Sequence, residues 1–359
     1  MHARQQSDSS IICFATTVTG LESLAADELE TRLEADIRKK APGLVIFRVN
    51  ELTPKLLRLR MVEDVFLLAW GTDSLTYRAA DLKQITHWTA KEARWPRLLQ
   101  AHHQVHPKPK GKPTYHLVCQ MHGKHGYRRL DALKALSRGL EGKFPSSWQP
   151  REENAAVEVW LIIHGKQALC GLRLSDKRMR HRTYKQAHMP ASLRPVVAAA
   201  MVQMAKLHPD EWLIDPLCGV GTILAERLSV NHHSSVLGGD ADRSALYAAY
   251  TNLRSLTDEP PLVRWDATEL PLADQSIPCI VTNLPFGRQI GSTEEIADFY
   301  DELLDEFDRV LTDQGRAILL VDDAEALSQC AFAHGWQQLD QLRIRLLGHD
   351  CYIMAWRKN

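Results

Sequence analysis

The sequence lacks the features that mark secreted, zinc-binding and membrane-spanning proteins. No run approaches the roughly 18 apolar residues that a membrane span requires, and residues 1–10 contain no apolar signal-peptide core. There is no Cys-x-x-Cys pair, and the seven cysteines lie too far apart in the sequence to suggest a disulfide framework or a structural zinc site. Histidines gather between residues 102 and 125 without acidic or cysteine partners at ligand spacing. We therefore expect a cytoplasmic protein without a bound metal.

The formal net charge is zero, but the charged residues are unevenly distributed along the chain. Lys plus Arg and Asp plus Glu both total 44. Basic residues concentrate in segments 108–143 and 173–185, whereas segment 294–313 is acidic. A charge run such as 108–112 is by itself equally consistent with a solvated face. The basic middle as a whole indicates an anionic partner held by one part of the chain.

The length of 359 residues favours two or three domains, since single cores stop growing at roughly 250–300 residues. In the first half the patterns predict helices over 21–33, 89–99 and 129–140 and an exposed loop over 101–113. Strands are expected over 11–16, 44–49, 56–60, 115–120, 156–163 and 169–174.

After Pro190 the pattern becomes an alternation of strands and helices. A helix over 193–207 is expected to begin beside Ser192 as N-cap, with Pro195 in its first turn. Strands over 212–215, 236–240, 277–283 and 317–321 alternate with helices over 222–228, 244–253 and 295–311. This order predicts an α/β fold with a parallel sheet covered on both faces. Segments 338–346 and 352–357 are too close for a helical crossover, so they form an antiparallel hairpin.

A glycine-rich turn follows the first strand of that sheet, in the run from Asp215 to Thr222 (DPLCGVGT). Gly219 and Gly221 permit a tight turn and close approach of the backbone to a ligand. The helix that begins at Thr222 favours a negative group at its N-terminus. Such a turn also occurs as a plain strand–helix connection, so the loop alone is weak evidence.

Two acidic residues stand at the next two strand ends. Asp240 follows Gly221 by about 20 residues, the spacing at which a carboxylate meets ribose hydroxyls in doubly wound folds. Asp242 is the better candidate to cap the following helix, which leaves Asp240 available. Asp266, followed by Ala267, comes after a third strand over 262–265 and can accept a hydrogen bond from an adenine amino group.

The fourth motif is the most informative: Asn283, Leu284, Pro285 and Phe286 directly follow the apolar strand 277–281. The Asn side-chain oxygen accepts hydrogen bonds, proline holds the turn, and the aromatic face can stack on a flat ring. This set suits an exocyclic amino group on a nucleobase. Because ligands of such sheets bind beyond the carboxyl ends of the strands, the four motifs are expected to form one site.

These motifs resemble motifs I to IV of class I S-adenosylmethionine-dependent amino-methyltransferases. Segments 21–29, 115–140 and 157–174 resemble the N-terminal region and THUMP domain of the guanosine N2-methyltransferases that act on tRNA, and segment 182–195 matches the junction between the two parts. One departure is Leu284, where related enzymes often have a second proline; its backbone carbonyl is retained.

The resemblance implies a ferredoxin-like region over 1–75, a THUMP RNA-binding domain over 76–180, and a Rossmann-like methyltransferase domain over 181–359, with a linker over about 175–192. It implies methyl transfer to the N2 amino group of a guanosine in tRNA, oriented by Asn283 and Leu284 with Phe286 stacked on the base. The expected S-adenosylmethionine site is formed by Asp215, Leu217, Cys218, Gly219, Gly221, Thr222, Asp240, Ala241, Asp266, Ala267 and Asn283.

A turn between the strand over 115–120 and the next helix is the main candidate for RNA contact, because it combines glycines, cations and an aromatic side chain. The resemblance implies that this region holds the single-stranded 3′ end of tRNA. The candidate RNA ligands are Lys124, His125, Tyr127, Arg128, Arg129, Lys134, Arg180 and Arg182.

Several alternatives stay open from the sequence. Asn-x-Pro-aromatic is equally compatible with guanine N2 of ribosomal RNA, adenine N6 or a protein glutamine as acceptor. An alternative that is not an enzyme is a catalytically inactive THUMP RNA-binding protein. The modified position, mono- or dimethylation, the oligomeric state and a small activating protein partner are not indicated by the residues.

Overall fold

The computed structural model describes residues 10–107, 111, 113–152, 154–190, 192–230, 235–286 and 293–358, without the side chains of 293–295. The chain divides into two compact units. The N-terminal unit contains Ala26–Leu59, Asp64–Asp176 and the residues up to Thr16. The C-terminal unit contains Lys177–Asn359 together with two short early segments, Thr17–Ala25 and Arg60–Glu63. None of the described helices has the length and apolarity to cross a membrane.

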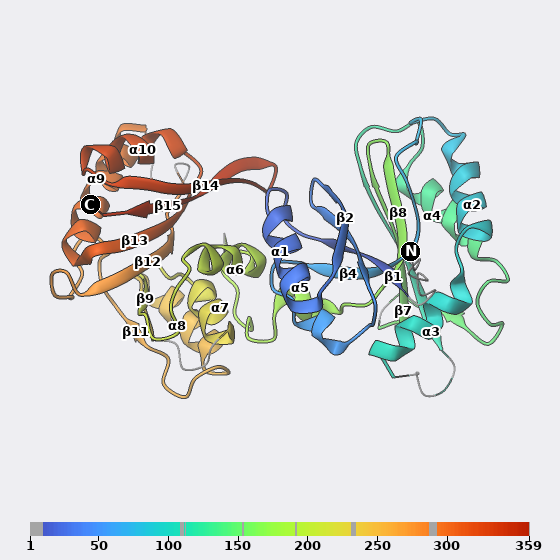
Figure 1. The fold of residues 1–359 in the computed structure, drawn as a ribbon, viewed down its shortest axis with the longest axis horizontal. Helices are drawn as coiled ribbons and strands as arrows, with labels where there is room; N and C mark the ends of the chain where they lie inside the picture. Colours follow the sequence, from blue (N-terminus) through green and yellow to red (C-terminus); the bar gives the residue numbers. More distant parts are fainter. Residues whose placement is uncertain are drawn as a thin grey trace, which may run out of the picture. The chain divides into compact units, whose positions relative to one another are not determined.

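The N-terminal unit is built on an eight-stranded sheet of order β2-β3-β1-β4-β8-β7-β5-β6 (Figure 1). All neighbouring pairs are antiparallel except β5 with β7 and β6. The strands are β1 (Ile11–Thr16), β2 (Asp36–Ala41), β3 (Leu44–Val49), β4 (Asp64–Thr72), β5 (Thr114–His122), β6 (Gln149–Pro150), β7 (Val157–His164) and β8 (Gln167–Arg173). Its helices are the 3₁₀ turn η1 (Pro54–Arg58), α2 (Asp81–Lys91), α3 (Trp95–Val105), α4 (Arg129–Leu140) and α1 (Glu22–Leu33) from Ala26 onward, since the start of α1 belongs to the C-terminal unit.

The centre of this sheet is packed too closely for any residue but glycine at one position. The rings of Phe14 and Phe66 stack with centroids 4.6 Å apart. A Cβ added at Gly171 would lie 2.4 Å from the carbonyl oxygen of Leu67 and 2.8 Å from the Phe14 ring. The backbone of β8 therefore approaches β4 and this aromatic pair directly, which joins the early and late strands of the unit into one sheet.

Three predictions for this half are wrong in detail. Segment 56–60 is not a strand, because Pro54 opens a 3₁₀ turn there. The single helix predicted over 89–99 is two helices, since α2 ends at Lys91 and α3 begins at Trp95 with Pro96 in its first turn. The predicted loop over 101–113 begins inside α3. Residues 108–110 and 112 of that loop lie outside the described residues.

The C-terminal unit contains a seven-stranded sheet of order β11-β10-β9-β12-β13-β15-β14. The first five strands are parallel, and β15 pairs antiparallel with both β13 and β14. The predicted antiparallel end is thus confirmed. The strands are β9 (Leu213–Asp215), β10 (Val236–Gly239), β11 (Leu262–Val263), β12 (Ile277–Asn283), β13 (Leu311–Val321), β14 (Gln337–Leu346) and β15 (His349–Arg357).

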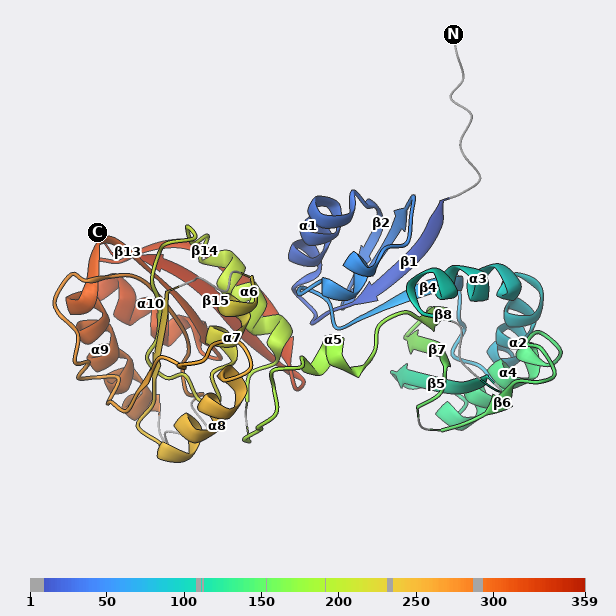
Figure 2. The same cartoon turned by 90° about the horizontal axis from the view of Figure 1, so that it is seen from below.

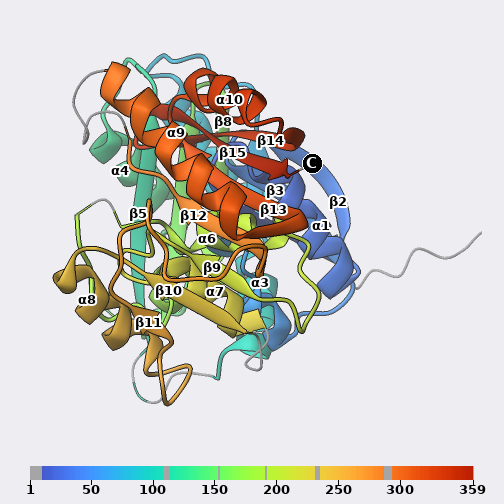
Figure 3. The same cartoon turned by 90° about the vertical axis from the view of Figure 1, so that its left-hand side faces the viewer.

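Helices cover both faces of this sheet. α6 (Pro195–Met204), α7 (Thr222–Val230) and α8 (Arg243–Leu253) lie on one face, and α9 (Thr293–Val310) and α10 (Ala324–Ala333) on the other (Figure 2). Figure 3 shows α9 running across the sheet in front of the strands. A short helix, α5 (Lys177–His181), precedes them in the same unit.

Two details of the sequence prediction differ here. The N-cap of α6 is Arg194 rather than Ser192, whose hydroxyl donates instead to the Met189 carbonyl oxygen at 2.6 Å. Helix α10 was not predicted, although Asp323 caps it by accepting from the backbone N–H groups of Glu325 and Ala326.

Candidate methyltransferase site

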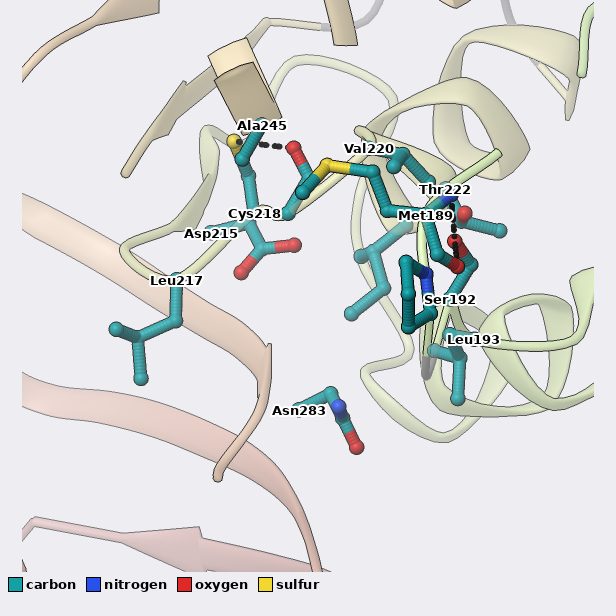
Figure 4. Close-up of a pocket in the computed structure, with 13 residues that line it drawn as sticks. Met189, Ser192, Leu193, Asp215, Leu217, Cys218, Val220, Thr222, Ala245 and Asn283 are labelled. Carbon is teal, nitrogen blue, oxygen red and sulfur yellow. Dashed lines mark hydrogen bonds between the residues drawn. The ribbon is translucent and has the colours of Figure 1, made fainter. Parts of the chain in front are cut away.

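The sheet brings the ends of β9 and β12 to a common cavity. Asp215 is the last residue of β9, and Asn283 is the last residue of β12. Both line a cavity of about 130 Å³ whose other walls come from the glycine loop, α7, α8 and the segment before α6 (Figure 4). The lining residues are Met189, Pro190, Ser192, Leu193, Asp215, Leu217, Cys218, Gly219, Val220, Thr222, Ile223, Ala245 and Asn283.

The glycine loop has the conformation that its sequence predicts. Gly219 and Gly221 adopt φ values of +51° and +73°, a region that side chains other than glycine disfavour. The loop leads into the N-terminus of α7, where Thr222 is 3% exposed. Within the described part of the chain, the Thr222 hydroxyl has no hydrogen-bond partner. A buried, unpartnered hydroxyl at a helix N-terminus fits a bound carboxylate.

Asp215 supplies the opposite charge to the same cavity. Its side chain is 1% exposed, and the Thr282 hydroxyl donates to Oδ1 at 2.7 Å. Burial raises the pKa of this carboxyl to about 7, against the lowering effect of its hydrogen bonds. Among the described residues no cation pairs with this buried carboxylate, which suits a ligand that carries an ammonium group.

Asp240 has a structural role that the sequence did not indicate. Its two oxygens accept backbone N–H groups of Gly219 and Asp242, each at 2.9 Å. It therefore holds the glycine loop, while its remaining lone pairs stay available for ribose hydroxyls. The expectation that Asp242 caps α8 is confirmed, since its Oδ1 accepts from the Ser244 N–H.

Asp266 lies in a turn and does not line the cavity. Its Oδ1 accepts from both the backbone N–H and the hydroxyl of Thr268, at 3.0 and 2.9 Å. The neighbouring Trp265 was not predicted as a site residue. Its indole N–H donates to the Pro216 carbonyl oxygen at 2.9 Å. Its ring lies where a Cβ at Gly239 would be, only 2.1 Å away. The glycine at the end of β10 therefore makes room for an aromatic support beneath the glycine loop.

Asn283 is the member of the Asn-Leu-Pro-Phe motif that lines the cavity. Its Oδ1 is buried and has no hydrogen-bond partner among the described residues. The motif is held by the Leu284 N–H, which donates to the Leu320 carbonyl oxygen at 3.0 Å, and by the Leu284 side chain, which is 2% exposed. Pro285 and Phe286 are half-buried, and Gly287 lies outside the described residues.

One wall of the cavity, formed by Met189, Pro190, Ser192 and Leu193, was not predicted. Asn252 of α8, which is fully buried, fixes the start of this segment by accepting from the N–H groups of Gln186 and Ala187 at 2.8 Å. Its Nδ2 donates to the Val220 carbonyl oxygen of the glycine loop at 2.9 Å. Segment 182–195 resembles the junction between the two parts of the related enzymes, but this resemblance did not predict that the segment lines the cavity.

The predicted RNA ligands fall into distinct environments. Lys124, Arg128, Arg129 and Lys134 are exposed on the N-terminal unit. Tyr127 is 7% exposed, and its ring packs 5.2 Å from His125, so it supports the turn rather than offering a free stacking face. In the C-terminal unit, Arg180 is half-buried and lies 3.9 Å from Glu63.

Arg182 does not fit the predicted role in RNA contact. Its side chain is 8% exposed and donates to Glu226 at 3.1 Å and to the backbone oxygens of Met179 and Arg60. Glu226, Met179 and Arg60 all belong to the C-terminal unit, and these contacts occupy the Arg182 guanidinium. The sequence showed a cation in a basic run but not the buried Glu226 that neutralises it.

Comparison with known proteins shows which proteins this chain is similar to. Residues 182–350 match the RMKL-like methyltransferase domain. The chain is 28% identical over 251 residues to the human tRNA (guanine(6)-N(2))-methyltransferase THUMP3, covering 65% of this chain and 49% of that protein. It is 26% identical over 313 residues to the tRNA (guanine(6)-N2)-methyltransferase of Thermus thermophilus, covering 85% and 88%.

The fold itself matches the crystal structure of TrmN from Thermus thermophilus, with a TM-score of 0.79, 23% identity, and coverage of 97% of this chain and 100% of that one. The chain spans about half the length of the mammalian relatives it matches. Its C-terminal unit has the class I methyltransferase fold, and the part of the chain that matches the RMKL-like methyltransferase domain lies within this unit.

Proposed function

We propose that the protein is an S-adenosylmethionine-dependent RNA methyltransferase that modifies the N2 amino group of a guanosine in tRNA. The observation that carries the proposal is the buried, unpartnered Oδ1 of Asn283 in the same cavity as the glycine loop and Asp215. An unsatisfied buried acceptor is costly unless a ligand supplies its donor. The names of the relatives in mammals and in Thermus favour guanine N2 of tRNA as that donor.

The cavity residues fit the two charged groups of the amino acid part of S-adenosylmethionine. Asp215 would hold its ammonium group, and the Thr222 hydroxyl with the N-terminus of α7 would hold its carboxylate. Asp240, Ala241, Asp266 and Ala267 remain the proposed contacts of its adenosine. When bound, this cofactor supplies a methyl group on a sulfonium, which is open to attack by a nitrogen lone pair.

The chain's own residues would bring the acceptor to that methyl group. Asn283 Oδ1 and the Leu284 carbonyl oxygen would accept the two N–H groups of the guanine amine, and Phe286 would lie against the ring. Positioning of this kind can supply much of a rate enhancement, because two reactants are held at attack distance. The base must leave its stack to enter the site, as base-modifying methyltransferases require.

The N-terminal unit is proposed to bind the 3′ end of tRNA as a THUMP domain, with its division near residue 75 from a ferredoxin-like region kept as a prediction. The exposed cations Lys124, Arg128, Arg129 and Lys134 support this assignment, since phosphate contact needs accessible positive charge. A protein with this substrate would act in the cytoplasm. The methyl-transfer assay with the purified protein also tests whether a small activating protein partner is needed.

Methyl transfer from labelled cofactor to separate pools of tRNA and ribosomal RNA tests the proposal. We expect N2-methylguanosine in the tRNA pool when its nucleosides are analysed by mass spectrometry. Label confined to ribosomal RNA, or found on adenine N6, would replace the proposed acceptor. Binding of tRNA without transfer to any RNA would instead identify an inactive RNA-binding protein.

A further inference from the structure

A second cavity in the C-terminal unit shares a wall with the methyltransferase site. It has a volume of about 250 Å³ and is lined by Glu63, Arg180, His181, Lys185, His188, Ser192, Leu193, Arg194 and Pro195. Ser192 and Leu193 line both cavities. Two segments far apart in the sequence form this basic pocket: Arg60–Glu63 and the stretch from α5 to the start of α6.

The charge of the basic pocket is strongly positive for its size. The lining residues include three cations, Arg180, Lys185 and Arg194, and one carboxylate, that of Glu63, without counting the histidines. Glu63 lies 3.4 Å from Arg194 and 3.9 Å from Arg180, and its own side chain is only 15% exposed. Glu63 therefore holds two guanidinium groups at one side of the pocket.

Lys185 is the buried part of this cluster. It is 9% exposed, and its Nζ donates to the Leu193 carbonyl oxygen at 2.5 Å. Burial lowers the pKa of Lys185 to about 8, which is the response of an ammonium group held away from water. A cation kept in such a place gains from an anion that enters the pocket. The N-terminus of α6, capped by Arg194, adds a favourable dipole for the same charge.

We propose that the basic pocket binds a backbone phosphate of the RNA strand whose base enters the methyltransferase cavity. The two cavities share Ser192 and Leu193, so a phosphate in one would anchor the nucleotide whose base occupies the other. Arginines at the rim suit the two exposed oxygens of a phosphodiester. The identity of the strand rests on the proposed function, whereas the anionic ligand follows from the pocket itself.

Two matched pairs of substitutions test this inference. Arg180→Gln with Arg194→Gln removes two cations from the pocket. Arg243→Gln with Arg254→Gln removes two exposed arginines of α8 and its C-terminus, from the same unit, that line neither cavity. The affinity of the full-length protein for tRNA is measured as a function of salt concentration. The affinity for S-adenosylmethionine, measured in parallel, reports whether each variant is folded.

The pocket pair is expected to weaken tRNA binding about tenfold or more and to lower the slope of log affinity against log salt by about 1 to 2. Cofactor affinity should stay within about twofold of the wild type, and the α8 pair should change neither slope nor KM for tRNA by a comparable amount. If the double substitution lowers cofactor affinity, Arg194→Gln alone is used, since that side chain is 46% exposed.

Equal losses in the two pairs would overturn the inference. So would binding of inorganic phosphate that disappears in the pocket pair while its tRNA affinity matches the α8 pair, because the pocket would then hold a free anion. These outcomes are independent of the proposed function. That proposal fails if the wild type forms no N2-methylguanosine in tRNA, which the separate methyl-transfer assay detects.

Discussion

Asn252 and Val220 are joined by a buried hydrogen bond of 2.9 Å, from the Asn252 amide nitrogen to the Val220 carbonyl oxygen. The same side chain donates to the Ala187 carbonyl oxygen at 3.1 Å and accepts from two N–H groups of the segment that begins the cavity wall. One amide therefore fixes the glycine loop and the wall relative to each other, within a single unit.

Asn252→Ala is expected to lower the free energy of unfolding by about 1–3 kcal/mol, because it leaves several buried backbone groups without partners. It should also weaken cofactor binding, since the loop and the wall lose their common support. Thermal unfolding and calorimetry measure the two effects. Arg254→Ala, at an exposed position just after the same helix, serves as the control. An Asn252→Ala variant as stable as the wild type would contradict the assigned role.

Asp215 should make the stability of the cofactor-free protein depend on pH. Its pKa in the folded state is raised to about 7 from the 3.8 of the free side chain. The folded state therefore binds more protons than the unfolded state between these values, so stability falls as pH rises through this window and stays reduced above it. Asp215→Asn should flatten that dependence in denaturant titrations, and an unchanged profile would show that Asp215 is not the group responsible.

Cofactor affinity should depend on pH in the opposite direction. A bound ammonium group favours the ionised form of Asp215, so wild-type affinity is expected to rise as pH increases from about 6 to about 8. In Asp215→Asn the affinity should be lower and nearly independent of pH over that range. Calorimetry at several pH values measures both slopes.

Gly239→Ala should destabilise the C-terminal unit by about 3 kcal/mol or more, the upper end for overpacking, because the new Cβ would lie 2.1 Å from the Trp265 ring. Gly348→Ala is the control. It has φ of +88° and no atom within 4 Å of its Cβ, so it loses only the cost of a left-handed conformation, about 1–2 kcal/mol. Denaturant unfolding compares the two; equal losses would argue against a tight Gly239–Trp265 contact.

The buried Glu226 should matter for folding rather than for RNA binding. It has no exposed side-chain surface and is paired with Arg60, Arg182 and the Tyr184 hydroxyl. Glu226→Ala leaves buried cations uncompensated and is expected to cost about 3–5 kcal/mol. Arg182→Gln should likewise lower stability while leaving the salt dependence of tRNA binding unchanged. A reduced salt slope for Arg182→Gln would instead restore its predicted role as an RNA ligand.

The parts of the site that could be predicted are those encoded by local sequence. A tight turn and a strand end each need particular residues at fixed spacing, so the sequence identifies Gly219, Gly221 and Asn283 as candidates. Asn252 and Trp265 could not be found in this way. Their roles depend on partners 32 and 49 residues away in sequence, and an asparagine or tryptophan in an amphipathic segment has no distinguishing pattern.

The same limit explains why the environments of Tyr127 and Arg182 differ from those expected of exposed RNA ligands. The sequence shows that Tyr127 and Arg182 lie near other basic residues, but burial is decided by packing against distant segments. Tyr127 turns inward beside His125, and Arg182 meets Glu226, which is 44 residues away. The sequence contains Pro54 and Pro96, but its local pattern does not show that each lies in the first turn of a helix.

In the proposed function, the Asn283 side chain orients an amino group for methyl transfer. The most direct test is single-turnover transfer of labelled methyl to tRNA by the wild type, by Asn283→Ala and by Gln203→Ala, which removes an exposed amide of α6 outside the cavity. We predict that Asn283→Ala lowers the rate of N2-methylguanosine formation by about 10²-fold or more, as loss of an orienting group at a reacting centre does, with cofactor affinity little changed and Gln203→Ala fully active. An Asn283→Ala enzyme that methylates tRNA at the wild-type rate would contradict the account.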